Sequence, residues 1–73
     1  MTLEEKIINS LILRYDAQKQ EASAMIELLI KKSVGIADHS KIIDELDSWV
    51  QVSAEAEDRK RTLMSLINVE IEK

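Results

Sequence analysis

The chain has 73 residues, a net charge of −4 and a pI near 4.9, with 45% apolar residues, one histidine and no cysteine. The missing cysteines exclude disulfides and a zinc site of the Cys/His type, and the acidic balance argues against a protein that binds nucleic acid mainly through phosphates. Because one core of this length rarely contributes more than about 3–5 kcal/mol, self-association is the remaining source of stability.

The composition favours helices. The chain has no Phe, no Pro and one Gly, and it is rich in Leu, Ala, Glu, Lys and Gln. These are good helix formers, whereas strands are enriched in aromatic and β-branched residues. We predict an all-α fold in a single domain of residues 1–73, an antiparallel two-helix hairpin.

The first helix is predicted over residues 3–33. Thr2, followed three residues later by Glu5, is a capping box, in which each side chain satisfies a backbone N–H of the first turn. Apolar residues spaced by three and four, interrupted by Gln18, predict one buried face. This inner row is Ile8, Leu11, Tyr15, Ala22, Met25 and Leu29, and a second row is Ile12, Ile26 and Ile30.

A turn is predicted over residues 34–39. Gly35 stands where a helix ends in the left-handed conformation, and Lys31 and Lys32 lie in the last turn, where the helix dipole favours cations. Ile36 can then fold back on Ile30. The short link predicts that the two helices are antiparallel neighbours.

The stretch "DHS" at residues 38–40 holds the single histidine. Three adjacent side chains splay apart and cannot hydrogen-bond in series, so they do not make a catalytic triad. We expect Asp38 or Ser40 to cap the second helix and His39 to be a bystander. With no Gly-rich phosphate loop and no Glu-x-x-His pair, we expect no enzyme, no cofactor and no metal site.

The second helix is predicted over residues 40–70. Its residues repeat the spacing of three and four that marks one face of a helix. The inner row is Ile42, Leu46, Trp49, Ser53, Ala56, Lys60, Leu63 and Ile67, and the second row is Ile43, Val50, Ala54, Met64 and Ile71.

Two such helices bury one face each, yet both carry apolar residues on more than one face. The surplus predicts that hairpins associate into a four-helix bundle or a higher helical oligomer, with a monomeric hairpin as the alternative. The residues expected in the core and oligomer interface are Ile8, Leu11, Met25, Leu29, Leu46, Trp49, Leu63 and Ile67.

The middle of each helix is poor in large apolar residues. Folding about residues 35–37 pairs positions whose numbers add to roughly 72–74, which brings "YDAQKQEASA" opposite "VSAEAEDRKR". We call residues 15–24 and 52–61 the polar waist. One interpretation is a close approach over small residues, with Gln18 or Ser53 fixing the register through a buried hydrogen bond.

The other interpretation is a binding gap for an anionic, nucleotide-like ligand, because guanidinium groups grip phosphate and tyrosine can stack on a base. Its lining would be Arg14, Tyr15, Gln18, Ser53, Arg59, Lys60 and Arg61. Against this interpretation, Glu55 and Glu57 lie four residues before Arg59 and Arg61, the spacing of surface ion pairs.

No stretch reaches the roughly 20 apolar residues that span a bilayer, and "MTLEEKIINSLILRYD" lacks the basic start and unbroken apolar run of a signal peptide. We therefore expect a cytoplasmic protein.

"TLEEKI" near the start and "SVGIADHSKIIDELDSWV" at residues 33–50 carry a resemblance. In these segments, which cover about a third of the chain, Val34, Gly35, Ile36, Glu45 and Val50 resemble the turn and following helix of the small helical chaperone for tail-fibre assembly in T-even-type bacteriophages. The resemblance implies a phage-encoded, oligomeric, non-enzymatic helper of assembly in the host cytoplasm.

Three functions follow from these patterns. The first is an oligomeric helical binding protein that acts on a protein partner, as an assembly chaperone or as an inhibitor of a host protein. The second is an oligomer that sequesters a small anionic nucleotide-like signal near the waist, an anti-defence activity. The third is an RNA-binding four-helix bundle, which has the right size and shape but requires a basic face that this acidic chain lacks.

Overall fold

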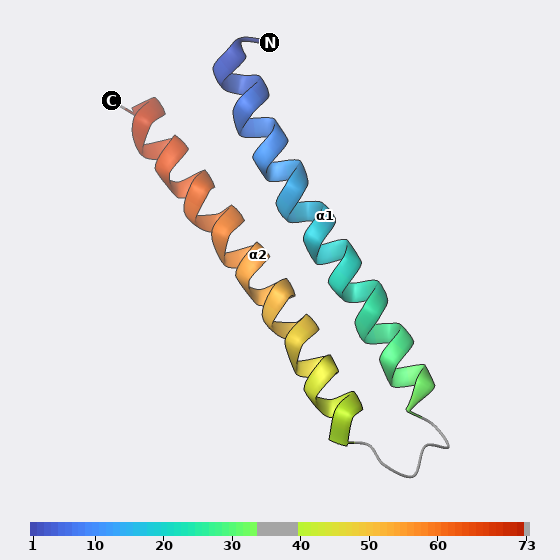
Figure 1. Cartoon of the computed structure of the whole chain (residues 1–73). Helices are drawn as coiled ribbons and strands as arrows, with labels where there is room; N and C mark the ends of the chain where they lie inside the picture. The colour runs from blue at the N-terminus through green and yellow to red at the C-terminus, as the bar shows by residue number, and fades with distance from the viewer. Residues whose placement is uncertain (34–39, 73) are drawn as a thin grey trace.

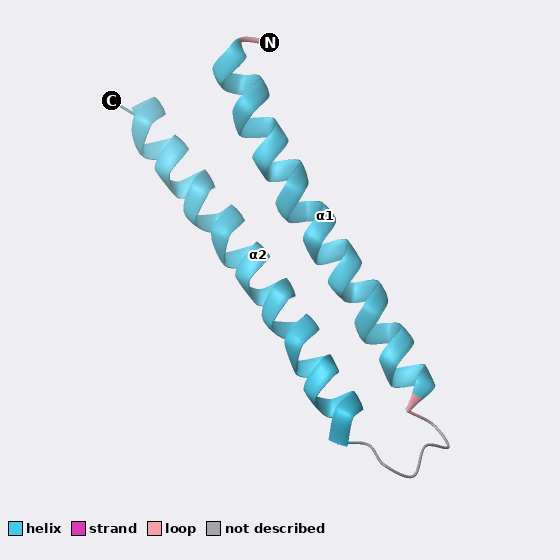
Figure 2. Ribbon diagram, in the orientation of Figure 1, coloured by secondary structure: helices cyan, strands magenta, loops and turns pink. Residues whose placement is uncertain are grey.

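The computed structural model describes residues 1–33 and 40–72, with side-chain burial given through Asn68. Helix α1 spans Leu3–Lys32 and helix α2 spans Ser40–Glu72, and they run antiparallel, side by side (Figures 1 and 2). Within the described ranges all regular structure is helical. The predicted helices over 3–33 and 40–70 are therefore confirmed to within two residues at each end.

The start of α1 keeps half of the predicted capping box. The backbone N–H of Glu5 donates to the Thr2 hydroxyl oxygen at 3.1 Å. In place of the reciprocal bond from the Glu5 side chain to the backbone, the Thr2 hydroxyl donates to the Glu5 carboxylate at 3.2 Å. Glu4 and Glu5 also lie in the first turn, where the helix dipole favours negative charge.

The C-terminal end of α1 is capped by hydrogen bonds from Ser33 to carbonyl groups of the last turn. Lys31 and Lys32 occupy the last turn, as predicted. The backbone N–H of Ser33 donates to the Leu29 carbonyl at 3.0 Å, and the Ser33 hydroxyl donates to the Ile30 carbonyl at 2.7 Å. The predicted roles of Gly35, Ile36, Asp38 and His39 fall on residues 34–39, which lie outside the described residues.

The predicted inner rows form the contact between the helices. Every member of both rows is buried or half-buried, including the predicted core residues. The buried residues in the described part are Ala22, Leu29 and Ala56, of which only Leu29 is large. One hairpin therefore aligns its apolar rows correctly but encloses very little apolar volume.

Ala22 and Ala56 are 0% and 1% exposed, although half-buried residues surround them on the inner rows. The facing helix and its side chains therefore cover both alanines completely. This burial agrees with the interpretation in which α1 and α2 pack over small residues at the polar waist.

The register differs slightly from the predicted one. Two ion pairs join the helices, between Asp16 and Lys60 and between Lys19 and Glu57, and in both cases the residue numbers add to 76 rather than to 72–74. The prediction that Gln18 or Ser53 fixes the register by a hydrogen bond is wrong. Within the described part of the chain neither side chain makes one, because both are only half-buried and stay accessible to water.

The hairpin is a thin rod, with extents of 57 × 20 × 12 Å. Its accessible surface is 5930 Å², whereas a compact monomer of 8.3 kDa exposes about 4,600 Å² on the usual scaling of surface with mass. The single hairpin thus exposes about 1,300 Å² more than a compact protein of its size.

Candidate functional site

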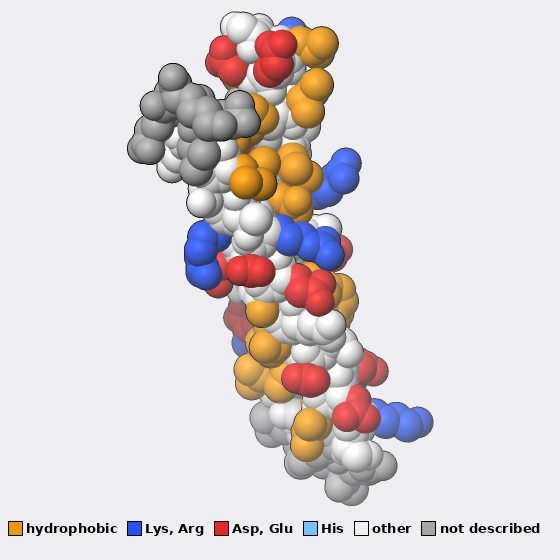
Figure 3. Space-filling view, turned by 90° about the vertical axis from the view of Figure 1, so that its left-hand side faces the viewer, with side chains coloured by type: hydrophobic (Ala, Val, Ile, Leu, Met, Phe, Trp, Pro, Cys, Tyr) orange, Lys and Arg blue, Asp and Glu red, His pale blue; other side chains and the backbone are white. Residues whose placement is uncertain are grey.

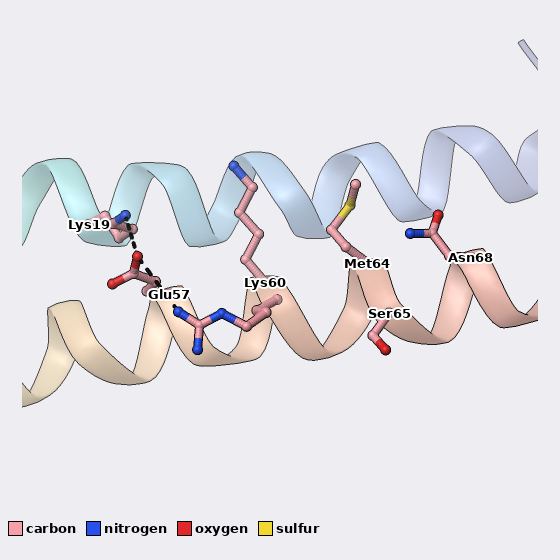
Figure 4. A pocket seen from close by; sticks show the side chains of 7 residues that line it. Lys19, Glu57, Lys60, Met64, Ser65 and Asn68 are labelled. Atoms are coloured by element: carbon pink, nitrogen blue, oxygen red, sulfur yellow. Dashed lines mark ion pairs between the residues drawn. The ribbon is translucent and has the colours of Figure 1, made fainter.

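Charged side chains cross the hairpin at the polar waist. The Lys60 Nζ atom donates to Asp16 Oδ1 at 2.7 Å, and the Lys19 Nζ atom lies 3.8 Å from Glu57 Oε1. Both pairs link α1 to α2, and Figure 4 shows Lys60 extending from α2 toward α1. The four side chains are 38–55% exposed, so these are surface ion pairs in contact with water.

The two waist arginines pair within their own helix. Arg59 Nη2 lies 3.9 Å from Glu55 Oε2, and Arg61 Nη2 lies 3.9 Å from Glu57 Oε1. The spacing of four residues predicted both contacts. Glu57 thereby meets two cations at one carboxylate oxygen, Lys19 from α1 and Arg61 from α2.

An open hollow lies beside these pairs on the surface of α2. Lys19, Lys60 and Arg61 border it together with Glu57, and Met64 and Asn68 continue it toward the chain termini (Figure 4). Lys19 is the cation that the sequence-based site lacked. The sequence could have identified Lys19 by its spacing, because it lies seven residues after Ile12 and seven before Ile26 and so shares the face of the second row.

The structure divides the predicted ligand residues between two sides of the hairpin. Lys60 and Arg61 border the hollow just described, whereas Tyr15 and Arg59 border a separate hollow on the other side, with Leu63 and Leu66. Consecutive residues of a helix point about 100° apart, so Arg59 and Lys60 cannot face the same way.

The remaining predicted ligand residues lie away from both hollows. Gln18 is half-buried between the helices, and Arg14 is exposed, with no ion-pair partner among the described residues. The waist as a whole carries four cations, Lys19, Arg59, Lys60 and Arg61, and five carboxylates, Asp16, Glu21, Glu55, Glu57 and Asp58. Its balance is therefore slightly acidic, and the cations that border a hollow already contact carboxylates.

Large apolar side chains are exposed on both helices. Ten of them are more than 40% exposed in the described part of the chain. On the side drawn in Figure 3, a band of charged side chains crosses the middle, and hydrophobic side chains lie above and below it together with further charged side chains at both ends.

A third hollow lies on the same side of the hairpin as Tyr15 and Arg59, and an aromatic residue borders it. Trp49 borders it with Met25 and Val52, and Glu45 and Ser48 form its polar edge. The side of the hairpin that carries Trp49, Tyr15, Leu63 and Leu66 is mainly apolar, and we call it the aromatic face.

The described residues contain neither a cluster of metal ligands nor a membrane span. No group of three His, Asp or Glu side chains gathers there in a way that could hold a metal ion. No helix among these residues is long and apolar enough to cross a membrane.

Comparisons with known proteins add no relative. No family model matches the chain, and searches of curated proteins and of solved structures return no match. The interpretation of the site therefore depends on its own geometry.

Proposed function

We propose that this chain is a non-enzymatic helical binding protein that works as a homo-oligomer on a protein partner, in the manner of an assembly chaperone or an inhibitor. One observation carries the proposal. The hairpin buries three residues in its described part while ten large apolar side chains stay more than 40% exposed. Monomeric soluble proteins rarely expose so much apolar surface in proportion to their size, and it usually marks interaction sites.

The excess surface fits the area that association needs. A standard protein interface buries about 800 Å² on each partner. The hairpin exposes about 1,300 Å² of total surface beyond a compact monomer, which is more than one interface with a second copy would bury on each chain.

The aromatic face is the surface that we assign to the protein partner. Tryptophan and tyrosine are enriched among the residues that dominate binding energy at interfaces, where they fill apolar depressions. Trp49 and Tyr15 each border such a depression here. The net charge of −4 adds a preference for partners with a basic rim around an apolar contact.

A capture experiment with matched variants tests this assignment. Proteins retained from a host lysate by the immobilised chain are compared with those retained by Leu66→Glu, which alters the aromatic face, and by Leu13→Glu, which alters an exposed leucine outside both of its hollows. We expect a specific protein to be lost with Leu66→Glu and kept with Leu13→Glu. Equal retention by all three proteins contradicts the assignment.

A second candidate is the sequestration of a small anionic, nucleotide-like ligand, favoured by the three cations around the waist hollow. Lys19, Lys60 and Arg61 could grip a phosphate if it displaced their carboxylate partners. A thermal-shift screen with nucleotides tests this, since a ligand at 100 times its dissociation constant adds about 2.7 kcal/mol.

Matched variants make that screen specific. Lys60→Ala should abolish a stabilising effect of the ligand, and Arg14→Ala, which lies outside the hollow, should preserve it. The absence of any stabilising nucleotide, or an effect that Lys60→Ala leaves intact, removes this candidate.

A further inference from the structure

The second apolar rows of the two helices lie on one side of the hairpin. Ile12 and Ile26 stand seven residues to either side of Lys19, and seven residues are close to two turns of a helix, so all three point the same way. Val50 and Met64 stand at the same spacing from Glu57. Because Lys19 contacts Glu57 across the helices at 3.8 Å, the two rows border the same surface.

Two more apolar residues extend this surface toward the turn end. Ile43 lies fourteen residues before Glu57, and Ile30 lies fourteen after Asp16, about four turns in each case. Ile30, Ile43, Val50 and Met64 are 54%, 61%, 48% and 41% exposed. We call this side the paired face, and its members are Ile12, Asp16, Lys19, Ile26, Ile30, Ile43, Val50, Glu57, Lys60 and Met64.

Charges alternate at the centre of the paired face. Along α1 the negative Asp16 is followed one turn later by the positive Lys19, and along α2 the negative Glu57 is followed by the positive Lys60. The helices are antiparallel and the pairs are Asp16 with Lys60 and Lys19 with Glu57. Asp16, Lys19, Glu57 and Lys60 therefore form a square in which each has an opposite charge beside it, both across the helices and along them. Arg61 lies beside this square and contacts Glu57.

Such a square is complementary to itself. A two-fold axis that crosses the helices at the centre of the square places a second copy face to face with the first, each helix antiparallel to its equivalent. Asp16 then faces Lys19 of the second copy, and Glu57 faces its Lys60. The ion pairs within one hairpin could form even if each helix carried charges of a single sign. The arrangement of two copies, in contrast, requires positive and negative charges to alternate along each helix. A surface of uniform charge would meet a like charge at all four corners.

We infer that the paired face is covered by a second copy of this chain, with the two hairpins stacked antiparallel to form a four-helix bundle. The inference rests on the proposed function, which includes self-association, and it identifies the surface through which two copies associate. The square of charges sets the orientation, and the apolar side chains toward both ends of the face lose contact with water. The aromatic face stays outside this contact and remains available to the protein partner.

A first experiment tests the location of the interface. Sedimentation equilibrium is measured for the unaltered chain, for Val50→Glu on the paired face and for Leu13→Glu outside it. We expect Val50→Glu to raise the dissociation constant of the dimer at least about tenfold, because it buries an unpaired carboxylate in the contact, and Leu13→Glu to change it less than about threefold.

A second experiment tests the orientation with charge swaps that keep the two ion pairs between α1 and α2 within each hairpin. Asp16→Lys with Lys60→Glu retains that pair but places like charges face to face in the antiparallel stack, so association should weaken at least about tenfold at low salt. Adding Lys19→Glu and Glu57→Lys restores alternation and should bring association back to within about tenfold of the unaltered chain. Circular dichroism at association-saturating concentration checks that each variant stays helical.

The outcomes separate the two levels of the proposal. An unaltered chain that is monomeric at every concentration overturns the proposed self-association, and this interface falls with it. An unaltered chain that associates while Val50→Glu associates equally well overturns the location alone. If the two-residue swap associates as tightly as the unaltered chain, the antiparallel orientation is overturned.

Discussion

At the polar waist the two helices meet over Ala22 and Ala56, which are fully buried, and two ion pairs join them across the hairpin. Toward both ends the contact is made by large apolar side chains, such as Trp49 and Leu63, which remain half-exposed. The waist therefore holds the helices close and in register but buries little apolar area. The ends carry the apolar area, and among the described residues no second layer covers it.

The difference shows where one hairpin buries its own inner side chains and where it leaves them exposed. The small residues at the waist bury one another within a single chain, because two short side chains fill the space between the facing helices. Large side chains on more than one face of a helix need neighbours on more than one side. The proposed self-association should therefore stabilise the ends more than the waist.

The largest effect of a single substitution is expected at Leu29, which is 5% exposed and is the one large buried residue in the described part of the chain. Leu29→Ala should lower the free energy of unfolding by about 2–5 kcal/mol, the range for large-to-small changes in a core. Urea unfolding followed by circular dichroism measures it. Leu13→Ala, at a leucine that is 66% exposed, is the control and should change stability by less than about 0.5 kcal/mol. Equal effects of both would contradict the placement of the core.

Trp49 at the same end comes next. Because it is half-exposed, Trp49→Ala should cost about 2–3 kcal/mol, below the range of about 3–5 kcal/mol for a fully buried tryptophan. If core and interface depend on each other, the variant should lose helix and association together. Sedimentation combined with circular dichroism measures both, and a helical, fully dissociated variant would show that the two are independent.

The waist should respond to added volume rather than lost volume. Ala56→Leu adds three carbons at a side chain that is only 1% exposed and should destabilise the hairpin by about 1–3 kcal/mol. Ala24→Leu makes the same change at an exposed position of α1 and should have little effect. Chemical denaturation compares the two, and a stabilising Ala56→Leu would mean that the space at the waist is not filled.

The smallest effect is expected from the ion pair between Lys60 and Asp16. A double-mutant cycle with Lys60→Gln and Asp16→Asn should give a coupling of about 0.2–1 kcal/mol, since both side chains are partly exposed. The coupling should shrink in 1 M salt, where the Debye length is about 3 Å. The pair Glu27 and Lys31, which is more exposed and lies within α1, serves as the control. A coupling that salt leaves unchanged would argue against a solvent-screened pair.

The sequence predicted the features that depend on spacing within one helix. The inner rows, the helix bounds and the pairs of Glu55 with Arg59 and Glu57 with Arg61 all follow from repeats of three and four residues, which the geometry of a helix turns into shared faces. The capping residue Thr2 was predictable for the same local reason.

Features that depend on the register between helices were predicted less well. Lys60 was expected to be available to a ligand, but a register sum of 76 brings Asp16 within 2.7 Å of it. A shift of two residues along one helix moves a side chain by about 3 Å and turns it by about 200°, so a small error in register changes every partner across the contact. The predicted ligand residues separated onto two sides of the hairpin for a different reason, because consecutive residues such as Arg59 and Lys60 point about 100° apart on one helix.

Whether the ends of the hairpin are covered by a second copy is decided by sedimentation equilibrium of the unaltered chain over a wide range of concentrations. We predict a mass of at least twice 8.3 kDa that falls toward 8.3 kDa only on dilution, accompanied by loss of helix. A fully helical species of 8.3 kDa at every concentration, with an unfolding midpoint independent of concentration, would contradict this account of the molecule.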